Sequence, residues 1–157
     1  MVVYTDGSKG KEGTAAGAGW AGYWGNSKTK IFSGHAKLPN HEVFDAEARA
    51  ALLGLQAALK DPRTQHSTKI YICLDNLEPV QQLQGQPKGS SQSIFMSFQE
   101  AAQTWPQHPR APGIQSGTVQ VKWAPGHTQA LKETKKQIRR LRWVAILPWS
   151  SLLHPPQ

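Results

Sequence analysis

Residues 44–60 have the sequence FDAEARAALLGLQAALK, in which Ala, Leu, Gln and Glu predominate and β-branched residues are absent. This composition predicts a helix, which the Asp-Pro pair at residues 61–62 would end. The segments before it, residues 2–5, 17–24 and 29–36, are β-branched, aromatic or alternating in size, and turn residues separate them. They are typical of an antiparallel meander. One long helix therefore separates a strand-rich start from the rest of the chain.

Strand-like and helical segments alternate after this helix. Residues 69–74 are continuously apolar, as in a central strand, and residues 118–123 form a last strand. Between them we predict helices at residues 77–84 and 91–105, the second with Ser91 as its N-cap. The order β, β, β, α, β, α, α, β predicts an α/β domain whose sheet is antiparallel in its first half, gains parallel strands afterwards, and is covered by helices.

The size and composition of the chain fit a single intracellular domain. At 157 residues it has room for one core, and it contains neither a run of 18 apolar residues nor a secretory signal after Met1. The single cysteine, Cys73, lies in the apolar run of residues 70–74, so we expect a buried thiol and no disulfide.

The net charge of +8 suggests a polyanionic partner. However, six of the eighteen Lys and Arg residues but only one of the ten acids lie from residue 127 onward, so the last part of the chain carries most of this charge. Basic excess alone is therefore a weak guide to function.

Three carboxylates occupy informative positions in the predicted map. Asp6 would end the first strand and Asp75 the fourth, and ligands gather at the carboxyl ends of strands in α/β sheets. Glu47 shares a helix face with Ala51 and Gly54, small residues that let a helix lie close to a sheet. Converging carboxylates favour Mg²⁺ or Mn²⁺ over zinc, and two such ions can hydrolyse a phosphodiester.

Each carboxylate also has an ordinary interpretation when it is considered alone. Asp6 could form an Asx turn before Gly7, Asp75 could cap the next helix, and Glu47 could be a solvated helix acid. The combination of the three with their surrounding motifs favours the functional interpretation.

Four motifs, in this order, resemble those of type 1 ribonuclease H. They are YTDGS at residues 4–8, DAEARA at 45–50, ICLDN at 72–76 and WAPGH at 123–127. The resemblance covers roughly residues 1–128. The stretches LDNLEPVQQL and GSSQSIFMSFQEAAQTW look particularly similar to the ribonuclease H segments of fungal non-LTR retrotransposons.

The resemblance implies a ribonuclease H-like fold with a five-stranded mixed sheet, and cleavage of the RNA strand of an RNA–DNA hybrid with two Mg²⁺ or Mn²⁺ ions. Asp6, Glu47 and Asp75 would be the metal ligands, and His127 the histidine that assists proton transfer or product release. The expected contacts to the 2′-hydroxyls of the hybrid come from the backbone around Gly7 and Ser8 and from the side chain of Asn76.

The resemblance also implies that this chain derives from a longer protein. We expect a monomer that derives from a longer chain, with a reverse transcriptase domain upstream, because few residues precede Asp6. Integrases and transposases share the fold, but they place their helix acid after the fourth strand region. Glu47 precedes that region, so the hybrid nuclease is favoured.

The last part of the chain departs from the family. Where the family has a fourth acid about ten residues after the histidine, this chain has Gln137, and residues 129–157 form a basic tail in place of the final helix. Residues 129–141 match what a family-like stretch would encode if it were translated from the second base of each codon, so we hypothesise a frameshift after His127. The cluster of Lys135, Lys136, Arg139 and Arg140 fits a nuclear signal, a loose nucleic-acid contact or a solvated charge run.

Loss of the fourth acid leaves three alternatives open. The chain could be a hybrid nuclease of reduced activity, a catalytically inactive module that still binds nucleic acid, or a retrotransposon relic without a selected function. The first two alternatives differ in whether another group of the chain replaces the missing acid. Protease resistance of the purified chain would distinguish both of them from the third.

Overall fold

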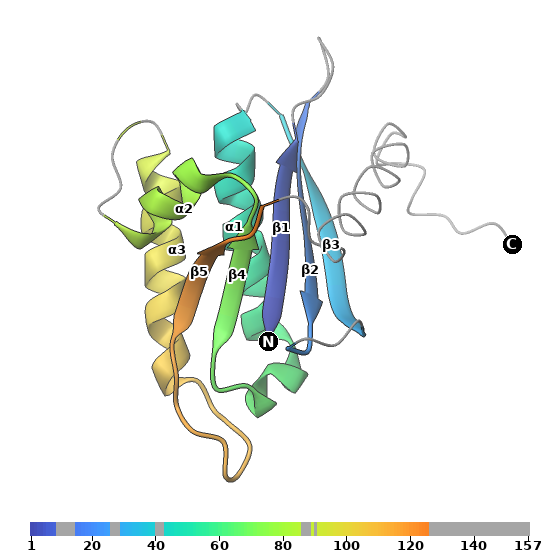
Figure 1. Cartoon of the computed structure of the whole chain (residues 1–157), viewed down its shortest axis with the longest axis vertical. Helices are drawn as coiled ribbons and strands as arrows, with labels where there is room; N and C mark the ends of the chain where they lie inside the picture. The colour runs from blue at the N-terminus through green and yellow to red at the C-terminus, as the bar shows by residue number, and fades with distance from the viewer. Residues whose placement is uncertain (9–14, 26–28, 40–42, 86–88, 90, 126–157) are drawn as a thin grey trace, which may run out of the picture.

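Five strands and three α-helices follow the predicted order in the computed structural model, which describes residues 1–8, 15–25, 29–39, 43–85, 89 and 91–125 (Figure 1). The strands are β1 (Val2–Ser8), β2 (Ala16–Tyr23), β3 (Lys30–Leu38), β4 (Ile70–Leu74) and β5 (Val119–Trp123). The α-helices are α1 (Val43–Lys60), α2 (Leu77–Gln84) and α3 (Gln92–Thr104). Short 3-10 helices, η1 (Pro62–His66) and η2 (Trp105–Gln107), follow α1 and α3. None of the helices in these ranges is long and apolar enough to span a membrane.

The strands form one mixed sheet in the order β3-β2-β1-β4-β5. β1, β2 and β3 pair antiparallel, whereas β4 pairs parallel to β1 and β5 parallel to β4. The predicted antiparallel first half and parallel additions are therefore confirmed. After the edge strand β3 the chain forms α1 and then β4, which pairs with the other side of β1. This connection begins the parallel half of the sheet (Figure 1).

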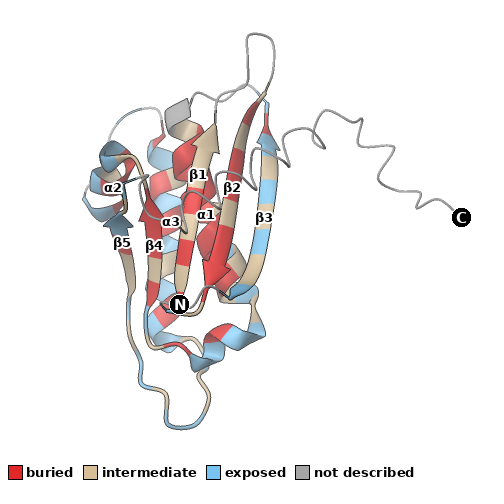
Figure 2. Ribbon diagram, turned by 45° about the vertical axis from the view of Figure 1, so that its right-hand side comes forward, coloured by how far each residue is buried: buried red, intermediate tan, exposed pale blue. Residues whose placement is uncertain are grey.

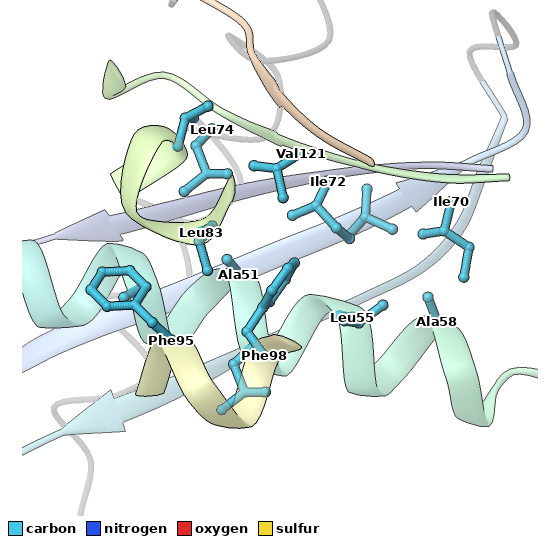
Figure 3. Close-up of a cluster of buried hydrophobic side chains, with 14 of the residues drawn as sticks. Ala51, Leu55, Ala58, Ile70, Ile72, Leu74, Leu83, Phe95, Phe98 and Val121 are labelled. Atoms are coloured by element: carbon cyan, nitrogen blue, oxygen red, sulfur yellow. The ribbon is translucent and has the colours of Figure 1, made fainter. Parts of the chain in front are cut away.

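The three α-helices form one layer on a single face of the sheet, where α1 contacts β1, β2, β4, α2 and α3. The core fills the space between this layer and the sheet, and buried residues alternate with more exposed ones along the strands (Figure 2). Figure 3 shows side chains from α1, β4, α2, α3 and β5 pointing toward one another in this core. They include Leu55, Ile72, Leu83, Phe95 and Val121. The basic tail that we expect in place of a final helix, residues 129–157, lies outside the described part of the chain.

The small residues of α1 allow the close packing that the sequence predicts. Ala51 and Ala58 are fully buried. A Cβ atom on Gly54 would lie 2.9 Å from Thr5 Cγ2 and 3.1 Å from Val3 Cγ1, both on β1. The helix therefore lies close to the centre of the sheet because its inner face has almost no side-chain volume at this point.

Two local predictions were wrong. β1 does not end before Asp6 but continues to Ser8, because residues 6–8 pair with Gly19, Ala18 and Gly17 of β2. Asp6 therefore lies within the strand and not in a turn that follows it. Ser91 precedes α3 but makes no side-chain cap hydrogen bond. Its hydroxyl donates instead to the carboxylate of Asp45 and so joins the beginnings of α3 and α1.

Cys73 is buried as predicted, and we expect its thiol to resist alkylation in the folded protein. Burial raises the pKa of the Cys73 thiol to about 11, although Lys122 acts in the opposite direction. Since the thiolate is the nucleophile, the folded protein at pH 8 should contain roughly 100-fold less reactive thiolate than a chain unfolded in urea. Rates of iodoacetamide labelling with and without urea test this expectation, and equal rates would contradict it.

The same thiol should make stability depend on pH in the alkaline range. The folded state holds the thiol proton more tightly than the unfolded state, whose thiol has its ordinary pKa of 9.0. The resulting stabilisation is present below pH 9 and is lost as the pH rises toward 11. A Cys73→Ala variant provides the control for urea unfolding curves measured across this range.

Candidate active site

Asp6 and Asp75 lie at the same end of the two central parallel strands. In the β1–β4 pair, Tyr4 lies opposite Cys73. Asp6 lies two residues after Tyr4 and Asp75 two residues after Cys73, so both acids follow the last paired residues of these neighbouring strands. Thr5 and Val3 face Gly54 of α1. Because side chains alternate along a strand, the side chain of Asp6 lies with that of Tyr4 on the opposite face of the sheet.

Glu47 approaches this end of the sheet from the helix side. A Cβ atom on Gly7 would lie 2.3 Å from the backbone nitrogen of Glu47 and 2.7 Å from its Cα. The backbones of β1 and α1 are therefore in direct contact one residue after Asp6. No other residue fits at position 7 without moving the helix, so Gly7 sets how close Glu47 comes to Asp6.

Glu47 is a buried acid, not a solvated one. Its relative exposure is 9%, and its Oε2 atom is inaccessible to solvent. Burying a carboxylate is costly unless hydrogen bonds or cations compensate its charge. The predicted position of Glu47 on the inner stripe of the helix is confirmed.

Asp75 lies at the junction between β4 and α2, where several contacts hold its backbone. Its carbonyl oxygen accepts a hydrogen bond from Trp123 Nε1 at 3.0 Å. The preceding carbonyl, of Leu74, accepts one from the Ala124 amide at 2.7 Å. Asn76 caps α2, since its Oδ1 accepts from the Glu78 amide at 3.1 Å. The N-cap of α2 is therefore Asn76, and the alternative in which Asp75 takes this role is excluded.

The three carboxylates fit a hard divalent cation by their chemistry, because oxygen-only ligands suit Mg²⁺ or Mn²⁺. Their side chains are not gathered around a common point. Among the described residues, no three His, Cys, Asp or Glu side chains are placed to hold a metal ion together.

Three of the four predicted catalytic residues, Asp6, Glu47 and Asp75, lie within the described part of the chain, and Gly7 contacts the backbone of Glu47 one residue after Asp6. Ser8 ends β1 beside them, and Asn76 follows Asp75. His127 and Gln137 lie outside the described residues. Sequence reasoning missed the indole contact to Asp75, although Trp123 belongs to a motif that it singled out.

A sheet of this order, with acids at the carboxyl ends of its two central parallel strands and on the crossing helix, defines a ribonuclease H-like fold. Solved structures of ribonuclease H domains are similar to this chain. The N-terminal domain of Rv2228c from Mycobacterium tuberculosis matches with a TM-score of 0.62 at 16% identity, covering 87% of this chain and 96% of that one. Ribonuclease H1 from Halobacterium salinarum matches with a TM-score of 0.60 at 18% identity, covering 85% and 89%.

A third similar structure contains a nucleic acid. It is LC11 ribonuclease H1, isolated from compost by a metagenomic approach and crystallised with an RNA/DNA hybrid. It matches with a TM-score of 0.61 at 18% identity, covering 90% of this chain and 98% of that one. No protein-family model and no curated protein sequence matches the chain. The structural likeness establishes the fold.

Proposed function

We propose that this chain is an RNA–DNA hybrid endoribonuclease that cleaves the RNA strand by metal-dependent phosphodiester hydrolysis. The observation that carries the proposal is that Asp6 and Asp75 follow the paired residues of neighbouring parallel strands at the same end of the sheet, and that Gly7 beside Asp6 contacts the backbone of Glu47. The hybrid bound by LC11 ribonuclease H1 supports this choice of substrate.

Asp6, Glu47 and Asp75 would hold two Mg²⁺ or Mn²⁺ ions. Such ions activate a water on one side of the phosphodiester and stabilise the leaving oxygen on the other. The chain contributes a rigid frame for the ligands, because Asp6 lies in a central strand and Glu47 in the longest helix. His127 would assist proton transfer or product release.

The 2′-hydroxyls of the RNA strand would be recognised next to these carboxylates. Gly7 and Ser8 end the strand that carries Asp6, and their backbone groups are candidates for these contacts. Asn76 uses Oδ1 as the cap of α2, and its side-chain nitrogen is a donor that the cap does not use. All of these groups belong to one chain, so we propose that the protein acts as a monomer.

We also propose an origin in a fungal non-LTR retrotransposon, with a reverse transcriptase domain upstream of a ribonuclease H-like domain at residues 1–128. The basic tail of residues 129–157 would then be the product of a frameshift after His127. The coding DNA tests this point, because the alternative reading frame should encode an Asn-Glu-x-Ala-Asp pattern. A frame without this pattern would refute the frameshift.

The test of function is cleavage of a labelled RNA strand in an RNA–DNA hybrid by the purified protein, with Mg²⁺ or Mn²⁺ at saturation. We expect slow cleavage, because Gln137 replaces the fourth acid that the family uses. A Gln137→Asp variant should cleave faster, and Gln137→Asn controls for the change in side-chain length. Cleavage that requires neither metal nor Asp6 would contradict the proposal.

Because position 137 is a glutamine and not an acid, hybrid binding without cleavage is a second candidate function. Without the fourth acid, the domain could bind hybrid through the same groups and cleave nothing. Hybrid binding by the wild type without cleavage in any variant would establish this alternative. Turnover at the ordinary rate of the family would exclude it and show that the acid at position 137 is dispensable.

A further inference from the structure

Trp123, the last residue of β5, combines an exposed ring with a specific hydrogen bond. Its relative exposure is 52%, and its Nε1 donates to the carbonyl oxygen of Asp75 at 3.0 Å. Trp105 shows the usual placement of such a ring in this chain, since it is 0% exposed within the core. Burial of the large indole surface therefore explains the position of Trp105 but only partly that of Trp123.

The Asp75 carbonyl depends on an outside donor because of where it lies. The pairing of β4 ends at Leu74, and α2 begins at Leu77. In a helix, this carbonyl would accept from the residue four positions later, but that residue is Pro79, which has no N–H group. The amide of Glu78, three positions later, donates to the Asn76 side chain. The Trp123 indole supplies the donor that neither element provides.

Two successive carbonyls are thus fixed by β5. The Ala124 amide holds Leu74 and the Trp123 indole holds Asp75, while the Asn76 cap fixes the next residue to α2. Loss of the indole bond would remove one of the restraints on the backbone of Asp75. A less restrained Asp75 backbone would let its Cα shift, and the carboxylate that the Cα carries would shift with it relative to Asp6 on the neighbouring strand.

We propose that Trp123 is a positioning residue that holds Asp75 in the orientation required for binding a divalent cation. This inference rests on the proposed role of Asp75 as a metal ligand. The proposed role belongs to the N–H group of the indole, which donates the hydrogen bond, and not to the size of the ring. A Trp123→Phe substitution removes the donor and retains an aromatic ring, so it is the appropriate variant.

The chain offers a matched control in Trp105. Its Nε1 also donates to a backbone carbonyl at 3.0 Å, that of Thr68, which precedes β4 at the opposite end from Asp75. Trp105→Phe therefore removes the same kind of hydrogen bond far from the carboxylates. Because this ring is buried, Trp105→Phe should lower the melting temperature more than Trp123→Phe does.

The experiment measures Mn²⁺ binding by isothermal titration calorimetry without nucleic acid. We expect Trp123→Phe to bind Mn²⁺ roughly 10-fold more weakly than the wild type, as is common when a group that orients a ligand is lost. Trp105→Phe, studied below its melting transition, should bind like the wild type. Wild-type affinity in Trp123→Phe would overturn the proposal, and so would equal weakening in both variants.

A second measurement is independent of metal. Amide hydrogen exchange of Asp75 and Asn76 in the metal-free protein should be faster in Trp123→Phe than in Trp105→Phe or the wild type. Unchanged exchange would refute the anchoring of Asp75. Faster exchange together with no Mn²⁺ binding by the wild type would support the anchoring and refute the proposed metal-dependent function, so the two failures are distinguishable.

Discussion

Replacing Asp6 with Asn is expected to reduce hybrid cleavage by at least about 1,000-fold, which corresponds to roughly 4 kcal/mol of transition-state stabilisation. The amide has nearly the same shape but no charge, so it binds a divalent cation poorly. Asp6 lies in the middle of the β1–β2 pairing, where the backbone holds the side chain in place. The substitution therefore changes the chemistry of the site with little effect on the fold. Initial cleavage rates at saturating metal measure the effect, in the wild type or in Gln137→Asp.

Glu78→Gln is the matched control for this experiment. Glu78 is an exposed acid in the first turn of α2, three residues after Asp75, and its removal changes the net charge by the same amount. We expect it to leave the cleavage rate unchanged. If both variants lost activity equally, the loss would reflect the general electrostatic field and not a ligand at position 6. If neither lost activity, Asp6 would not be catalytic.

Gly7→Ala is expected to destabilise the protein by about 3 kcal/mol or more and to abolish metal binding together with cleavage. The new methyl group would lie 2.3 Å from the backbone nitrogen of Glu47 and 2.6 Å from the carbonyl carbon of Ala46. A helix backbone cannot give way as a flexible side chain can. The substitution therefore forces α1 away from β1 at the point where Asp6 and Glu47 come closest.

Gly17→Ala separates this clash from the general effect of removing a glycine from a strand. Gly17 pairs with Ser8 on the neighbouring strand, and its added methyl group would meet the Ser8 hydroxyl at 3.3 Å, which a side-chain rotation can relieve. We expect a change within about 1 kcal/mol, with a contribution toward stabilisation from the restricted unfolded chain. Urea unfolding of both variants gives the comparison. A Gly7→Ala variant as stable as Gly17→Ala would show that α1 can shift without cost.

The order of the secondary structure could be predicted because it depends on local composition. Residues 77–84 were predicted as a helix and form α2 with the same bounds, since Asn76 caps its start and Pro79 suits its first turn. The inner face of α1 followed from the spacing of Glu47, Ala51 and Gly54. Asp6 and Asp75 could also be proposed as candidates from sequence, because their position at the end of strand-like segments is a local property.

Predictions from local composition were wrong where contact with a distant segment determined the conformation. The sequence of residues 6–8 is typical of a turn, yet β2 pairs with it through Ser8 and extends the strand. Ser91 has the composition of a helix cap, but the carboxylate of Asp45, far away in sequence, takes its hydrogen bond. In both places a tertiary contact was more favourable than the local alternative, and such contacts leave no pattern within a short window of sequence.

By itself, the sequence determined which residues could form strands and helices, where carboxylates follow or accompany them, and that Gln137 stands where the related family has an acid. Only the tertiary structure decided that Gly7 contacts the backbone of Glu47, that β1 pairs in parallel with β4, and that Trp123 holds the Asp75 carbonyl. The physical reason is that propensities and caps act over a few residues of one segment. Register and close approach depend on how strands and helices distant in the chain pack together.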